Sequence, residues 1–100
     1  MQHSIKASGQ DVEIILSGRL TFADAPGFPT FLSALDKAAK TRWNFDLAQL
    51  EFIDSTGMSL FVHVYDAAAA MDVKVSILNS CGNVSETLKR AAFHTLFDFK

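Results

Sequence analysis

The stretch from Phe52 to Met58 reads Phe-Ile-Asp-Ser-Thr-Gly-Met, and it joins two segments whose hydrophobic patterns differ. Before it, apolar and polar residues alternate from Trp43 to Leu47, as in a half-buried strand, and a short corner at residues 48–50 leads into Glu51-Phe52-Ile53. After it, apolar residues recur with helical spacing from about Ser55 to Met71. The stretch is therefore predicted to connect a strand to a long helix.

The residues of this connection suit the start of a helix. Asp54, Ser55 and Thr56 are all favoured N-cap residues, and Gly57 permits close packing or an unusual backbone angle there. A helix start also carries unpaired N–H groups and a partial positive charge, which attract anions such as phosphate. The local sequence leaves two interpretations open: a well-capped helix with no further role, or a site that holds a charged group.

The N-terminal part of the chain is predicted to form a β-hairpin. The segment from Val12 to Leu16 is rich in β-branched residues and ends at a turn signal, Ser17-Gly18. An earlier strand from about Ser4 to Ala7 can pair with it through Ser8-Gly9-Gln10.

A helix is predicted to follow Asp24, which is a good N-cap residue. Pro26 falls where a missing N–H is tolerated, and Pro29 must lie in the first turn or begin the helix proper. The predicted apolar face has spacings of three and four residues and consists of Phe28, Phe31, Leu32, Leu35, Ala38 and Ala39. Positive charges, which the helix dipole favours at its far end, gather at Lys37, Lys40 and Arg42.

The last third of the chain adds a strand and a helix. Val73 to Leu78 is predicted to be a strand, and Ser85 is predicted to cap a helix that runs to about Phe93. Phe97-Asp98-Phe99 can add a short last strand. The order β-β-α-β-α-β-α, with that short strand, predicts an α/β fold in which helices flank a mixed sheet, in a single domain over residues 1–100.

Composition narrows the class of protein. With 49% hydrophobic and 20% charged residues, the chain is typical of a globular domain rather than a disordered one. The net charge of −2 provides no general electrostatic reason to bind nucleic acid. No run of about eighteen apolar residues predicts membrane insertion, and the polar start from Met1 to Ser4 lacks a secretory signal. We therefore expect a cytoplasmic protein.

No residue pattern indicates catalysis. The lone Cys81 has no paired base near it in the sequence, and the three histidines lack metal-ligand spacing: His3, His63 and His94. A nucleophile–base pair, a carboxylate dyad and a glycine-rich phosphate loop are also not recognisable. The sequence favours a binding module without cofactor or metal over an enzyme.

The long helix carries more apolar surface than one contact needs. One stripe consists of Gly57, Leu60, Val64, Ala68 and Met71, and a second, with Phe61 between the two, of Met58, Val62, Tyr65 and Ala69. The second stripe either packs on neighbouring helices or leaves Met58, Val62 and Tyr65 partly exposed as a docking surface beside Ser55. Core positions are predicted at Trp43, Phe45 and Phe52.

The tetrapeptide Asp54-Ser55-Thr56-Gly57, after a short strand and before an apolar helix, resembles the signature of STAS-domain anti-sigma factor antagonists. The resemblance extends to Gly18-Arg19-Leu20 after the second strand. It also includes the ending from Glu86 to Arg90 and on to Leu96-Phe97, so it covers nearly the whole chain.

This resemblance implies a STAS-like fold and a regulatory module switched by phosphorylation. Ser55 would be the phosphoacceptor, with Asp54 as its acidic neighbour and Thr56 as a second acceptor. Unphosphorylated, such a domain binds a serine kinase or anti-sigma factor with a histidine-kinase-like ATPase fold, and phosphate reverses the binding. The implied partner-binding residues are Asp54, Ser55, Thr56, Gly57, Met58, Val62, Tyr65, Thr21 and Asp24.

One position departs from the family pattern. Thr21 stands where family members often carry an acidic residue, and Asp24, a turn further on, is a candidate substitute. The alternative function is a STAS subunit that regulates a transporter, or binds a lipid or nucleotide, without phosphorylation. Such proteins often alter the serine of the motif, so the presence of Ser55 favours the phosphorylated class.

Overall fold

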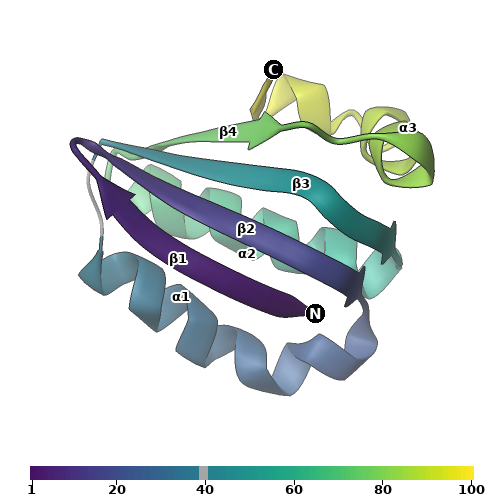
Figure 1. Cartoon of the computed structure of the whole chain (residues 1–100), viewed down its shortest axis with the longest axis horizontal. Coiled ribbons are helices and arrows are strands. Elements are labelled where there is room, and N and C mark those ends of the chain that lie inside the picture. The colour runs from purple at the N-terminus through teal and green to yellow at the C-terminus, as the bar shows by residue number, and fades with distance from the viewer. Residues whose placement is uncertain (39–40) are drawn as a thin grey trace.

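Five strands form one sheet in the order β1-β2-β3-β4-β5 in the computed structural model, which describes residues 1–38 and 41–100 (Figure 1). The strands are β1 (Gln2–Ser8), β2 (Asp11–Leu20), β3 (Arg42–Ile53), β4 (Lys74–Leu78) and β5 (Asp98–Phe99). β1 is antiparallel to β2, and every other neighbouring pair is parallel. The predicted hairpin, mixed sheet and short last strand are confirmed.

Helices connect the parallel strands. They are the 3-10 helix η1 (Phe22–Gly27), α1 (Phe28–Lys37), α2 (Ser55–Ala70), α3 (Gly82–Arg90) and the 3-10 turn η2 (Phe93–Thr95). In Figure 1, α1 and α2 lie beneath the same face of the sheet, and α3 lies beyond the end of β4. This arrangement is the predicted order of elements.

An aromatic chain runs through the core between the sheet and these helices. The ring of Phe45 on β3 lies 6.4 Å from Phe31 of α1 and 5.5 Å from Phe61 of α2, between ring centroids. Trp43 and Leu47 lie two residues on either side of Phe45 and are also fully buried. The predicted core positions Trp43 and Phe45 are therefore confirmed.

Polar side chains on the strands bond to one another across the sheet. Asn44, which alternates with the core residues of β3, donates from Nδ2 to Asp11 Oδ2 and to Glu13 Oε1, each at 3.0 Å. The Arg42 guanidinium donates to the Ser76 hydroxyl and lies 3.3 Å from Asp98 Oδ2. One face of the sheet thus builds the core and the other satisfies polar groups.

Two bulges replace the corner predicted at residues 48–50. Between Ile15 and Ser17 of β2 the partner strand advances from Asp46 to Gln49, and a second register shift follows Gly18. Each shift places an extra residue in β3, which remains one continuous strand. Gly18 has a φ of +82°, a conformation that glycine adopts without steric penalty, so β2 continues to Leu20 instead of ending at Ser17-Gly18 as predicted.

Two predicted helix caps are wrong. Asp24 does not cap α1; it lies inside η1, and Pro29 falls in the first turn of α1, which begins at Phe28. Ser85 lies inside α3, because its N–H already bonds the Cys81 carbonyl and the helix begins a turn earlier. The predicted apolar face of α1 is buried or half-buried at Phe28, Phe31, Leu32, Leu35 and Ala38, whereas Ala39 and Lys40 lie outside the described residues.

Candidate functional site

Asp54 fixes the start of α2 at the carboxyl ends of β2 and β3. Its backbone is extended, with φ −100° and ψ −176°, and its Oδ1 accepts a hydrogen bond from the Gly57 N–H at 2.7 Å. Its own N–H donates to the Leu20 carbonyl at 3.2 Å. Asp54 is therefore the N-cap of α2 and also joins the helix to the end of β2.

Gly57 is required by close packing. A Cβ built on it would lie 2.4 Å from the carbonyl oxygen of Leu20 and 2.8 Å from Cγ1 of Ile53. The first of these atoms is backbone and cannot move aside cheaply. The first turn of α2 consequently rests directly on the end of β2.

The segment after β2 folds back onto the motif. The Phe22 N–H donates to Asp54 Oδ2 at 3.2 Å, so the two oxygens of one carboxylate bind amides from two segments. Thr21 and Asp24 form a capping box in which Thr21 Oγ1 accepts from the Ala23 N–H at 3.3 Å and Asp24 Oδ2 accepts from the Thr21 N–H at 2.9 Å. Thr21 and Asp24 thus shape this loop, and the other Asp24 oxygen lies 2.9 Å from the amino group of Met1.

Ser55 is exposed at the first position of α2. Thr56 beside it is half-buried, and the carbonyl of Ser55 accepts a hydrogen bond from the Ser59 hydroxyl at 3.2 Å. The Ser55 side chain is accessible from solvent and lies where the helix dipole gives a partial positive charge. A group transferred to this hydroxyl would not have to enter the core.

Part of the second apolar stripe of α2 is exposed, as a docking surface requires, and part of it packs against neighbouring elements. Met58 is half-buried and Val62 is 38% exposed, whereas the Tyr65 ring packs edge-on against Phe97 at 5.8 Å between centroids. Ser55, Met58 and Val62 share one helical face, since they are three and four residues apart. Tyr65 belongs mainly to the packing between α2 and the C-terminal segment.

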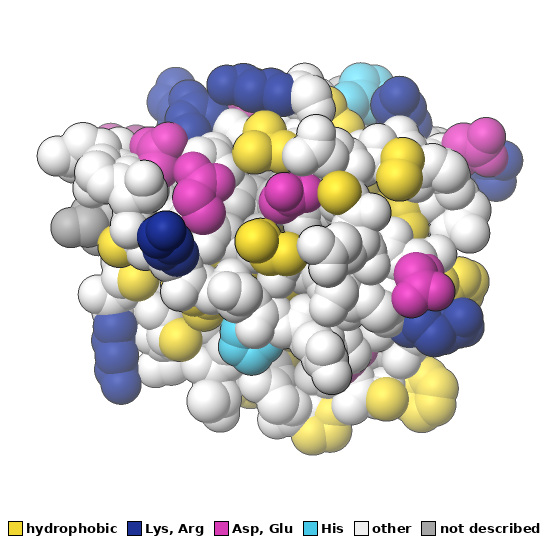
Figure 2. Space-filling model, in the orientation of Figure 1, with side chains coloured by type: hydrophobic (Ala, Val, Ile, Leu, Met, Phe, Trp, Pro, Cys, Tyr) yellow, Lys and Arg dark blue, Asp and Glu magenta, His cyan; other side chains and the backbone are white. Residues whose placement is uncertain are grey.

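Sequence reasoning misplaced one aromatic residue and missed another. Phe52 is half-buried, not core, and the Arg19 guanidinium stacks 4.3 Å from its ring centroid, because the bulges in β3 change which face each residue takes. Phe22 is 73% exposed, more than any other large apolar side chain in the described part of the chain. Figure 2 shows apolar side chains at the surface over η1, and charges of both signs interspersed across the rest of that face.

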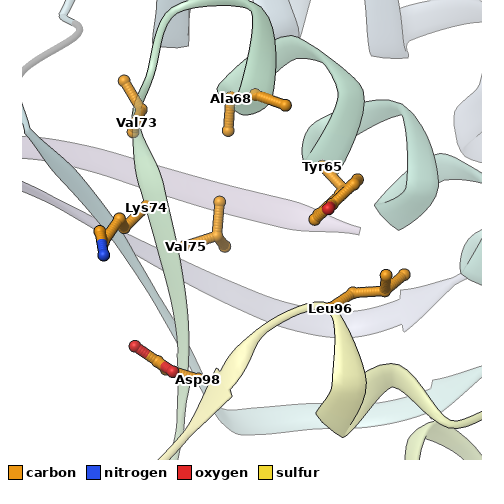
Figure 3. Close-up of a pocket in the computed structure, with 8 residues that line it drawn as sticks. Tyr65, Ala68, Val73, Lys74, Val75, Leu96 and Asp98 are labelled. Carbon is orange, nitrogen blue, oxygen red and sulfur yellow. The ribbon is translucent and has the colours of Figure 1, made fainter.

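A cleft lies near the carboxyl end of α2. The cleft has a volume of about 290 Å³ and lies between α2, β4 and the C-terminal segment. Figure 3 shows Tyr65, Val75 and Leu96 around it, with Lys74 and Asp98 on one side. Among the described residues, no cluster of three or more His, Cys, Asp or Glu side chains could hold a metal ion. Within residues 1–38 and 41–100, no helix has the length and hydropathy needed to cross a bilayer.

The sheet order, the three connecting helices and a serine directly after the N-cap of the second helix are the features expected of a STAS domain. The family model described as Mlab, STAS domain matches residues 3–98, and the chain belongs to that family. No curated protein matches the chain.

Solved structures share this fold at low sequence identity. SpoIIAA of Bacillus in its phosphorylated form is 17% identical, with a TM-score of 0.72, over 99% of this chain and 91% of that one. An anti-sigma factor antagonist of Mycobacterium paratuberculosis is 14% identical, with a TM-score of 0.80, over 98% and 83%. A sulfate transporter family protein of Wolinella succinogenes is 14% identical, with a TM-score of 0.76, over 94% and 80%. The resemblance to anti-sigma factor antagonists is confirmed at the level of the fold.

Proposed function

We propose that the chain is a regulatory protein-binding module of the anti-sigma factor antagonist type, switched by phosphorylation of Ser55. The observation that supports this best is the exposed hydroxyl of Ser55 directly after the Asp54 cap. SpoIIAA, which shares the fold, has been solved in both unphosphorylated and phosphorylated forms. Thr56 is half-buried and is the second candidate acceptor.

The proposed partner is a serine kinase or anti-sigma factor with a histidine-kinase-like ATPase fold, in the cytoplasm. The unphosphorylated form binds through the exposed face of α2 that carries Ser55, Met58 and Val62. A phosphate adds about −1.5 to −2 charges at neutral pH. Burying that charge against apolar side chains is unfavourable, so phosphorylation releases the partner. The module regulates by binding and performs no chemistry of its own.

The test is phosphorylation by purified kinases. The chain is incubated with ATP and each serine kinase of this ATPase class encoded in the same genome, and its intact mass is measured. We expect one added phosphate that maps to Ser55 and is lost in Ser55→Ala. Ser59→Ala is the matched control, since Ser59 is an exposed serine one turn further along α2. An unchanged mass with every kinase, or a phosphate that maps away from Ser55 and Thr56, would contradict the switch.

A second candidate is a STAS subunit that regulates a transporter without phosphorylation. The observation in its favour is the shared fold of the sulfate transporter family protein from Wolinella succinogenes. Thr21 stands where the family often has an acidic residue, and this departure is also compatible with a function that does not require phosphorylation. Purification of the chain from its own cells distinguishes the two candidate functions. The transporter subunit should carry an unmodified Ser55 and should co-purify with transporter components.

A further inference from the structure

The cleft near the carboxyl end of α2 opens along an edge of β4 that β5 leaves uncovered. β5 pairs with β4 only at Ser76 and Ile77, and residues 73–75, which come just before them, line the cleft. Figure 3 shows the space beside residues 73–75 bounded by Tyr65 of α2 and Leu96 of the C-terminal segment. An uncovered strand edge is a template on which a further strand can pair.

The backbone of this edge points into the cleft at alternate residues. The Lys74 N–H bonds the Thr41 carbonyl on the β3 side at 3.1 Å, whereas the Ile77 carbonyl accepts from the C-terminal segment on the opposite edge at 2.9 Å. Because backbone groups alternate between the two edges of a strand, those of Val73 and Val75 are directed to the same edge as those of Ile77. Within the described part of the chain, the Val73 carbonyl and the Val75 N–H have no hydrogen-bond partner there.

A strand added at this edge must alternate apolar and polar side chains. Val73 and Val75 are buried on the helix side of the sheet, whereas Lys74 between them is exposed on the other face. Side chains that lie opposite each other on paired strands share a face. The residue opposite Lys74 would therefore lie in solvent beside its ammonium group. Its two neighbours would enter the cleft, where the small side chains of Ala68 and Ala69 leave room for apolar groups.

The position opposite Lys74 favours a carboxylate. Lys74 and Arg42 are register partners on neighbouring strands, so two cations lie opposite each other. Arg42 is paired with Asp98 at 3.3 Å, and Asp11, its register partner on β2, accepts from Asn44 at 3.0 Å. Lys74 forms no ion pair with any residue that the structure describes. An acidic residue across from Lys74 would be stabilised by the opposite charge, and a basic one would be destabilised.

The last strand of the chain shows the same pattern on the same edge. In Phe97-Asp98-Phe99, Phe97 is buried and Phe99 is half-buried, whereas Asp98 between them is exposed and pairs with Arg42. β5 is thus an apolar–acidic–apolar segment that adds to β4. A segment of this pattern from another chain would continue the edge over residues 73–75.

We propose that the cleft is a docking site for an extended segment of another protein, with an acidic residue between two apolar ones, which adds as a strand to residues 73–75 of β4. The Val73 carbonyl and the Val75 N–H would hold its backbone, and Lys74 would select its acidic residue. The site lies at the end of α2 opposite Ser55 and does not depend on the proposed phosphorylation switch.

The test is an NMR titration of the isotope-labelled chain with a blocked pentapeptide of sequence Thr-Val-Glu-Val-Thr. We expect a dissociation constant near or below about 1 mM. Hydrogen exchange of the Val75 amide should slow about tenfold, because the amide gains a partner. A probe with lysine in place of the central glutamate should bind about fivefold more weakly, and Lys74→Glu should reverse this preference.

Two controls separate strand addition from other kinds of binding. A probe that is N-methylated at its glutamate and at the following valine cannot donate to the Val73 carbonyl in either strand direction, and it should not bind. Ala69→Leu fills the cleft from α2 and should abolish binding. Ala70→Leu is the matched control, since Ala70 is exposed like Ala69 but does not line the cleft. Both variants should melt close to the wild type, because both positions are exposed.

Spectra unchanged at about 5 mM probe would overturn the proposal, because a dissociation constant of about 1 mM would then leave most sites occupied. Equal binding of the N-methylated probe would also overturn it and would make the cleft a pocket for side chains only. If the wild type dimerises in sedimentation and Ala69→Leu does not, the occupant is a second copy and the partner protein is wrong. Ser55→Ala should bind the probe like the wild type, so the docking site and the switch can fail independently.

Discussion

The two ends of α2 are built in different ways. At its amino end, backbone hydrogen bonds and close packing define the structure: Asp54 binds amides of Phe22 and Gly57, and the first turn lies directly against Leu20. Exposed groups there are uncharged, and they include Ser55. Asp54 and Gly57 thus connect this end of the helix to segments distant in sequence.

At its carboxyl end, α2 borders the cleft of Figure 3, which Lys74 and Asp98 line on one side. β5 pairs with β4 only at Ser76 and Ile77, so Lys74 has no strand neighbour on that edge. Arg42 donates there to the Ser76 hydroxyl and forms an ion pair with Asp98 at 3.3 Å. The Ser55 hydroxyl lies at the end of α2 whose position is set by the backbone rather than by flexible side chains, as the fixed geometry of a functional site requires.

The largest effect of a single substitution is expected at the amino end. Gly57→Ala should lower the free energy of unfolding by about 3 kcal/mol, because the new Cβ would overlap the Leu20 carbonyl and overpacking against backbone is not relieved by rotamer changes. Urea denaturation measures the loss. Gly27→Ala is the control, since a Cβ there meets no atom within 4 Å. Equal stability of the two variants would show that the end of β2 can move away from α2.

An intermediate effect tests where the docking face ends and the core begins. Tyr65→Glu should lower the unfolding free energy by about 2 kcal/mol, because it removes an aromatic pair with Phe97 and places a charge against the core. Val62→Glu should change it by about 0.5 kcal/mol or less, since surface substitutions rarely do more, but should weaken partner binding. Thermal melts and titration check both. If Tyr65→Glu is as stable as the wild type, Tyr65 is not part of the core packing and is again a candidate residue of the docking surface.

The smallest effect is expected at the carboxyl end. Asp98→Asn removes the ion pair with Arg42, in which the Asp98 side chain is 61% exposed and the Arg42 side chain 27%. The free energy of unfolding should fall by about 0.5 kcal/mol or less. The difference should vanish in 1 M salt, where the screening length is about 3 Å. Denaturation at low and high salt measures it. A loss comparable to that of Gly57→Ala would erase the contrast between the two ends.

Much of the fold could be predicted from local pattern. The strands, the long helix and its buried stripe follow from hydrophobic period, and four of the five residues in the first stripe are buried: Gly57, Leu60, Val64 and Ala68. Met71 is the exception because it lies just after the last turn of α2. The sequence offers three candidate caps, and the bond from the Gly57 N–H to Asp54 Oδ1 identifies Asp54 as the cap.

The order of elements and the motif could be predicted from local sequence, since both depend on periodicity and cap chemistry within a few residues. Three features depend on contacts between distant segments: the two bulges in β3, the stacking of Phe52 on Arg19 and the exposed position of Phe22. The physical reason is the range of the contacts. Asp54 bonds an amide 32 residues away, and such a bond forms only once β2 and β3 have paired.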